Sequence, residues 1–173
     1  MPRGDSREAI EEYAHSICES LRCVTHSVIG FGQGVTPVGR VGTLNFLPEP
    51  TAPLYGTKKL ALFFSHTYES VQDSRDQLWK VNTRSYFYSV YDCHNGERHE
   101  IFSYQWHPDQ TIKIPHVHFK KGEPRITRAH LPTGRVSIES IVELLIQDLG
   151  VKGKAKWESI IARNRKLPER YEY

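Results

Sequence analysis

Two histidines, His116 and His118, lie two residues apart in a segment that alternates between apolar and polar residues. Successive side chains of a β-strand point to opposite faces of a sheet, so residues at this spacing share a face. The alternation predicts a strand over residues 114–120. One face would carry Ile114, His116, His118 and Lys120, and the other Pro115, Val117 and Phe119.

Paired imidazoles are suited to acid–base catalysis, because a pKa of about 6.5 lets them accept and donate protons near neutral pH. With His107 as a third catalytic residue, the pair could take the proton of a ribose 2′-hydroxyl and protonate the leaving group in RNA cleavage. Lys120, Arg125 and Arg128 would bind the phosphate and stabilise its developing charge. This chemistry requires no cofactor.

Metal binding is an alternative role for the same pair. His116 and His118 would ligate a divalent transition metal ion, with a third ligand from His107, His130 or Glu123. Glu123 follows the pair in the spacing His-x-His-x4-Glu. A structural role is the third interpretation, in which the histidines lie on a solvated strand or join a hydrogen-bond network.

Positive charge is concentrated in the C-terminal third of a chain whose formal net charge is only +3. Residues 112–135 hold six basic residues and one acidic residue, a net charge of +5. Residues 151–173 hold seven basic and three acidic residues, a net charge of +4. A basic patch attracts anionic partners such as RNA, although basic segments are also commonly only solvated.

An Asn-Gly pair at residues 95–96 separates two segments, 84–91 and 98–106, that are rich in aromatic and β-branched residues. Asn-Gly is preferred in two-residue hairpin turns, because both central positions need a positive φ. The pattern therefore predicts a β-hairpin.

Uninterrupted pairing from this turn places Phe87 opposite Tyr104 on the core face of the hairpin. Tyr86 and Tyr88 would then lie on the polar face together with His107. There the two tyrosines could stack on a base or donate hydrogen bonds to a bound substrate.

His130 precedes a Leu-Pro-Thr-Gly break and a helix signal at Ser137. Because a helix N-terminus favours an anion, His130 is a candidate substrate-binding residue. The alternative is that residues 131–134 only redirect the chain.

Helices are predicted near both ends of the chain. Residues 6–22 carry apolar residues at helical spacing, with Ser6 as the N-cap. Ser137 caps a second helix that stops at Gly150, and a third covers residues 155–165. The third helix would dock through Trp157, Ile160 and Ile161.

Strands are expected between these helices. Residues 30–53 are rich in glycine and proline and predict either a long loop or short strands with bends. Residues 59–65 predict a buried strand, and residues 125–130 a basic strand after a turn at 121–124. The order of elements predicts a single α+β domain over residues 1–173, an antiparallel sheet flanked by an N-terminal helix and two C-terminal helices.

Several classes of protein are excluded by composition. No apolar run approaches the roughly 20 residues that cross a bilayer, and the charged N-terminal segment is unlike a secretory signal. Three cysteines without a C-x-x-C pair argue against a disulfide framework or a cysteine-based zinc site. We therefore expect reduced thiols in a cytoplasmic protein without a membrane partner.

Residues 84–145 resemble small bacterial toxins of the TumE type and related uncharacterised proteins. The resemblance is carried by the aromatic segment 86–88, the hairpin through Tyr104, the Pro-His-Val-His segment at 115–118 and the helix after Ser137. It implies a toxin-like ribonuclease that acts on RNA, with a cognate antitoxin as protein partner. The alternative is a non-catalytic metal-binding or protein-interaction domain of a bacterial operon protein.

Overall fold

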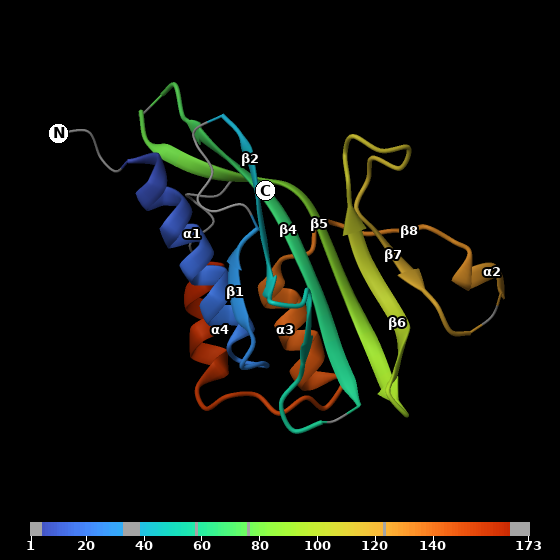
Figure 1. Ribbon diagram of the computed structural model, residues 1–173. Helices are drawn as coiled ribbons and strands as arrows, with labels where there is room; N and C mark the ends of the chain where they lie inside the picture. The colour runs from blue at the N-terminus through green and yellow to red at the C-terminus, as the bar shows by residue number, and fades with distance from the viewer. Residues whose placement is uncertain (1–4, 33–38, 58, 76, 123, 167–173) are drawn as a thin grey trace.

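The computed structural model describes residues 5–32, 39–57, 59–75, 77–122 and 124–166. Over this part of the chain the protein has an α+β fold, with an antiparallel sheet, an N-terminal helix and two C-terminal helices (Figure 1). The predicted fold class is confirmed. Within the described residues, no helix is both long and apolar enough to cross a membrane.

Helices and strands do not alternate regularly along the chain: most strands follow one another with no helix between them. The helices are α1 (Ser6–Leu21), α2 (Pro124–Thr127), α3 (Ile138–Gln147) and α4 (Trp157–Arg165). The strands are β1 (Val28–Phe31), β2 (Val41–Leu47), β3 (Thr51–Pro53), β4 (Leu60–Gln72), β5 (Trp79–His94), β6 (Glu97–Trp106), β7 (His116–Phe119) and β8 (Leu131–Pro132). The strand order in the sheet is β1-β2-β4-β5-β6-β7-β8, and β3 pairs with β4.

The glycine- and proline-rich region at residues 30–53 forms short strands rather than one long loop. It contributes β2, β3 and the end of β1 to the sheet. Its residues 33–38 lie outside the described residues. The buried strand predicted at 59–65 is part of the longer strand β4.

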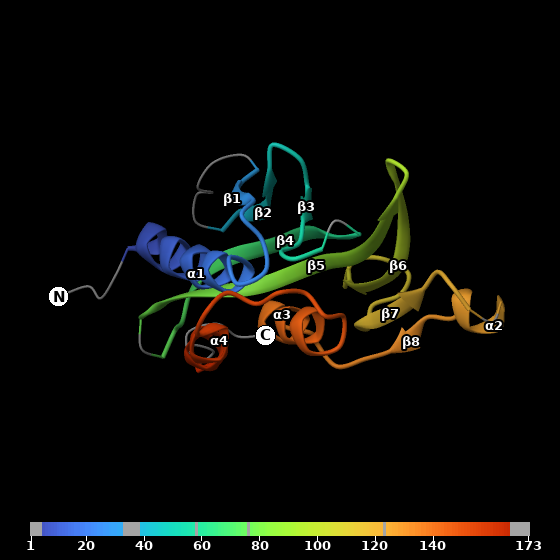
Figure 2. The same cartoon turned by 90° about the horizontal axis from the view of Figure 1, so that it is seen from below.

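Three helices cover one face of the sheet. Helix α1 packs against β4, β5, α3 and α4, and Figure 2 shows α3 and α4 on one side of the sheet. The apolar side of α1 predicted from its spacing is buried: Ile10, Tyr13, Ala14, Ile17 and Leu21. This layer forms the hydrophobic core, because the apolar side chains of β2, β4 and β5 face it.

The N-cap of α1 is Asp5, and the prediction of Ser6 is wrong. The Asp5 carboxylate accepts a hydrogen bond from the backbone N–H of Arg7 at 2.6 Å. Aspartate and serine are comparable caps, so the pattern alone could not choose between neighbouring candidates.

The two C-terminal helices begin and end close to the predicted positions. The Ser137 hydroxyl accepts from the backbone N–H of Ser140 at 3.3 Å and caps α3, as predicted. Helix α3 ends at Gln147, and Gly150 has a φ of 69°, which a glycine tolerates best. In α4, Ile161 is buried, and Trp157 and Ile160 pack against the core, so the predicted docking face is confirmed.

The β5–β6 hairpin turns at Asn95 and Gly96, whose φ values are 52° and 82°. Close to the turn the register is the predicted one, since His94 pairs with Glu97. A β-bulge between Val90 and Tyr91 then shifts the register by one residue. Beyond it Tyr88 pairs with Tyr104.

The predicted pair Phe87–Tyr104 is therefore wrong, because Phe87 pairs with Gln105. The bulge also reverses the predicted face of Tyr86 and Tyr88, which are buried beneath the helices. Since residues paired across an antiparallel ladder share a face, the shift places Phe102 and Trp106 on the helix-covered side together with the two tyrosines. Burial of this aromatic set explains why the interrupted register is preferred.

The segment after β7 folds as a short helix rather than as the predicted strand over residues 125–130. Helix α2 begins at Pro124, a residue favoured at the first helical position because it lacks the N–H that a helix leaves unpaired there. Residues 131–132, expected to be only a chain break, form β8 and pair with β7. Figure 2 shows α2, β7 and β8 together at one end of the sheet.

Candidate metal centre

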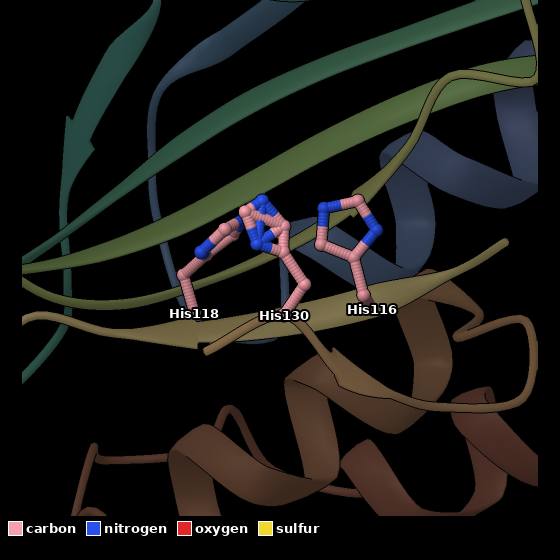
Figure 3. A group of neighbouring side chains, drawn as sticks. All are labelled: His116, His118 and His130. Atoms are coloured by element: carbon pink, nitrogen blue, oxygen red, sulfur yellow. The ribbon is translucent and has the colours of Figure 1, made fainter. Parts of the chain in front are cut away.

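Three histidines, His116, His118 and His130, meet on the face of the sheet that the helices do not cover (Figure 3). His116 and His118 belong to β7, whose alternation leaves them on one face, as predicted. β8 pairs with β7 through His116–Pro132 and Val117–Leu131. Continuing this register by one pair brings His130 opposite His118, so the β7–β8 pairing assembles the cluster.

The ring nitrogens of the cluster are close enough to share one metal ion. One ligand atom from each residue lies within 4.8 Å of those of the other two. The His130 ring is stacked on that of His116 with 5.2 Å between centroids, and its centroid is 4.3 Å from that of His118. The centroids of His116 and His118 are 4.9 Å apart.

A backbone contact orients the deepest of the three rings. Nδ1 of His116 lies 2.8 Å from the carbonyl oxygen of Ile114. A carbonyl oxygen only accepts, so Nδ1 carries the hydrogen and donates, which leaves Nε2 with a free lone pair. Metal-ligating histidines are commonly held in this way by a hydrogen bond from the second ring nitrogen.

Burial differs across the cluster. The His116 side chain is only 4 % exposed, His118 is half-buried, and His130 is exposed. Burial lowers the pKa of His118 from its ordinary value, and His130 and His116 lower it further. The Glu100 carboxylate acts in the opposite direction. The neutral form, which is the form that binds a metal ion, is therefore favoured at His118.

The donor set suits a divalent transition metal ion, for which the described residues supply three ligands. Zinc in catalytic sites is commonly held by three protein ligands, with water in the fourth position, and imidazole nitrogens also suit copper and nickel. Near the cluster, Glu100 carries a buried Oε1 atom for which the described part of the chain supplies no hydrogen-bond partner. A buried acceptor of this kind is suited to a water molecule or ion held beside it.

His107 lies beside this cluster, outside the group of three ligands. Burial lowers its pKa, and the neighbouring His116 lowers it further. Glu123, the alternative metal ligand predicted from its spacing, lies outside the described residues. The structure thus brings His130 together with His116 and His118. From the sequence, His130 is a candidate both for substrate binding and for the third metal ligand.

The basic side chains predicted to bind phosphate are exposed around the cluster. Lys120 follows β7, Arg125 belongs to α2, and Arg128 comes directly after that helix. Helix α2 contacts β7, so all three side chains come from segments next to the histidines.

Tyr86 and Tyr88 cannot serve as exposed substrate-binding residues, because their side chains are only 3 % and 1 % exposed. The hydroxyl of Tyr86 accepts a hydrogen bond from the backbone N–H of Val136 at 3.0 Å. The hydroxyl of Tyr88 lies 2.6 Å from Nδ1 of His66. Both tyrosines therefore have structural partners on the helix-covered face, and the prediction of a polar-face position is corrected.

His66 is a buried histidine that the sequence analysis did not single out. Its Nε2 contacts the hydroxyl of Tyr13, and the hydroxyl of Thr83 is 3.3 Å from the same atom. Burial lowers the His66 pKa to about 3, so the ring is neutral at physiological pH. The sequence does carry a signal for the burial of His66. It lies in the apolar strand β4, two residues after Phe64 and two before Tyr68, so the alternation places it on the same buried face.

Comparison with protein-family models, with curated proteins and with solved structures finds no match to this chain. The resemblance to TumE-type toxins therefore stays a prediction, and the candidate site rests on its own geometry.

Proposed function

We propose that the protein binds a divalent transition metal ion, with zinc the best fit, through His116, His118 and His130. The observation that carries the proposal is the convergence of three imidazoles whose ligand atoms all lie within 4.8 Å of one another. The hydrogen bond from His116 to the Ile114 carbonyl supports it, because it directs the free nitrogen of that ring without needing the metal.

The proposal predicts one Zn²⁺ bound per chain and the loss of binding when a ligand is removed. We expect His118→Gln and His130→Gln each to weaken Zn²⁺ binding by on the order of 100-fold, since changes even to the groups that support a ligand weaken binding 10–100-fold. The measurement is competition of purified metal-free protein against a chromogenic chelator. Co²⁺ gives a second readout, because its visible absorption reports the coordination geometry.

His99→Gln is the matched control. His99 is an exposed histidine near the tip of the β5–β6 hairpin, where it pairs with Glu97. This variant should bind Zn²⁺ as the wild type does. Equal binding by wild type, His118→Gln and His130→Gln, or no binding by the wild type, would refute the metal site.

RNA cleavage is the second candidate function, favoured by the exposed Lys120, Arg125 and Arg128 beside the histidine cluster. These cations would bind phosphates, and the cluster would act either by acid–base chemistry without metal or through the bound ion. His116 is the least suited of the three to touch RNA directly, because it is almost fully buried. A toxin-like role with a cognate antitoxin, and a cytoplasmic location, belong to this same proposal.

The two modes of cleavage are separated by incubating structured RNA with purified protein in EDTA and, in parallel, with Zn²⁺. Cleavage in EDTA that is lost in His118→Ala indicates acid–base chemistry. Cleavage only after addition of metal, lost in the same variant, indicates a metal-dependent nuclease. Intact RNA under both conditions contradicts nuclease activity and leaves the metal-binding proposal to its own test.

A further inference from the structure

A second polar site lies on a different part of the molecule, where three segments far apart in the sequence come together. These segments are residues 22–26 after α1, residues 55–56 before β4, and residues 152–155 between α3 and α4, which meet near the lower end of the molecule in Figure 1. They line an open pocket of about 540 Å³. Its lining includes Arg22, His26, Tyr55, Gly56, Lys152 and Lys154.

Backbone hydrogen bonds hold the three segments in place. The Tyr55 N–H donates to the Val24 carbonyl at 2.8 Å, and the Lys152 N–H donates to the Tyr55 carbonyl at 3.1 Å. The Lys154 N–H donates to the Cys23 carbonyl at 2.9 Å. The pocket is therefore part of the folded framework, because its three walls are joined through the main chain.

Gly56 makes the close approach of two walls possible. It has a φ of 68°, and a Cβ atom at this position would lie 2.6 Å from the Cβ atom of Lys152. Any other residue would need a strained backbone and would push the Lys152 segment away.

The pocket is strongly positive. Arg22, Lys152 and Lys154 line it, and none of its lining residues among those described is acidic. None of these three cations forms an ion pair within the described residues, although nearby Glu19 is engaged by Arg163 at 2.7 Å. Three cations that line one pocket, with no carboxylate among its described lining residues, create a positive potential that attracts an anion.

An aromatic pair forms a further part of the lining. The Tyr55 hydroxyl lies 3.0 Å from Nδ1 of His26, and the two ring centroids are 4.3 Å apart. The contact keeps both rings at the pocket, where a planar group could stack. The volume is within the 300–1,000 Å³ typical of small-molecule sites and exceeds what a phosphate ion alone would fill.

We propose that this pocket binds a small phosphorylated molecule with an aromatic ring, of the size of a mononucleotide. The phosphate would bind Arg22, Lys152 and Lys154, and the ring would pack beside Tyr55 and His26. This site shares no residue with the histidine cluster, so the inference does not depend on the proposed metal binding.

The test is a titration of ¹⁵N-labelled full-length protein with adenosine 5′-monophosphate, followed by NMR. We expect the amide signals of residues 22–26, 55–56 and 152–155 to shift, and binding to weaken with added salt. Inorganic phosphate should bind more weakly at the same amides, and adenosine more weakly still. Equal binding of adenosine and the monophosphate, or shifts confined to other residues, would overturn the proposal.

The double variant Lys152→Gln/Lys154→Gln should weaken binding of the monophosphate about tenfold or more, because it removes two charge-assisted contacts. Both side chains are exposed, so the fold should be retained. The matched control is Lys59→Gln/Lys113→Gln, which removes the same charge from two exposed lysines that do not line the pocket. Equal loss of binding in both double variants would indicate non-specific attraction and refute the site.

Discussion

At the scale of single residues, His66 connects protonation to folding. Its ring is enclosed by hydroxyls of Tyr13, Thr83 and Tyr88 on the helix-covered face. A neutral ring satisfies this arrangement, since one nitrogen donates and the other accepts. Protonation would place a charge in the core, which is why burial lowers the pKa to about 3.

Stability is expected to fall as the pH drops below the ordinary histidine pKa of 6.5. Between that value and about pH 3, the unfolded chain binds a proton at His66 and the folded chain does not. The free energy of unfolding should therefore decrease by about 1.4 kcal/mol per pH unit from this group. Urea unfolding of wild type and His66→Gln over this window measures the contribution as a difference in slope.

His99→Gln serves again as a control, because it removes an exposed histidine outside the core. In the wild type, the His66 ring protons should also show no titration by NMR near pH 5.5. A His66 ring that titrates near its ordinary pKa, or equal slopes for wild type and His66→Gln, would contradict the assignment.

At the scale of elements, the hairpin turn depends on backbone conformation alone. A Cβ atom at Gly96 would meet no atom within 4 Å, but the φ of 82° is unfavourable for an L-residue. We expect Gly96→Ala to destabilise the protein by about 1 kcal/mol. Urea or thermal unfolding measures the change.

Gly134→Ala is the matched comparison, because its Cβ atom also would meet nothing within 4 Å and its φ lies outside the left-handed region. This change should be neutral or stabilise the protein by about 0.5 kcal/mol, through the lower entropy of the unfolded chain. Equal effects of the two substitutions would show that the turn does not require a positive φ at Gly96.

Helix caps and turns could largely be predicted from the sequence, because each depends on a few neighbouring residues. The register between strands could not, because it depends on contacts with residues far away in the sequence. Ser137 before a periodic apolar run and the Asn95-Gly96 turn are each determined by a few neighbouring residues. The bulge at Val90 arises instead from packing of the aromatic side chains of β5 and β6 under helices that are remote in the sequence. No pattern within either strand carries that information.

The candidate site was partly predictable for the same reason. The alternation around His116 and His118 correctly placed both on one face. The position of His130 depends on β8 pairing with β7, a contact made by two residues in a segment that reads as a turn. The sequence pattern allows His107, His130 or Glu123 as the third ligand and does not select His130, because it predicts a strand where helix α2 forms.

At the scale of the whole molecule, a buried polar junction joins the three helices on the covered face. The Asn164 amide in α4 donates to the Ser16 carbonyl at 2.9 Å and to the Ser20 hydroxyl at 3.0 Å, both in α1. The Ser20 hydroxyl donates to the Glu139 carboxylate in α3 at 3.0 Å. One amide group thus adds buried hydrogen bonds to the apolar contacts through which the last helix docks.

We expect Asn164→Ala to lower the free energy of unfolding by about 2 kcal/mol, because it leaves buried partners without their hydrogen bonds. The adjacent Arg163→Ala removes an exposed ion pair with Glu19 and a long hydrogen bond from Nε to Oδ1 of Asn164 at 3.4 Å, and should lower it by less than about 1 kcal/mol. Chemical denaturation of both variants provides the measurement. A larger loss in Arg163→Ala than in Asn164→Ala would contradict this account of helix docking.

The graded burial of the three histidines determines the route by which the proposed metal ion would be exchanged. His116 lies beneath the surface, whereas His130 is open to solvent. An incoming chelator would thus reach the ion first from the side of His130 and last from the side of His116. Release would be a stepwise replacement of ligands from one side, with a rate governed by access at His130 as well as by affinity.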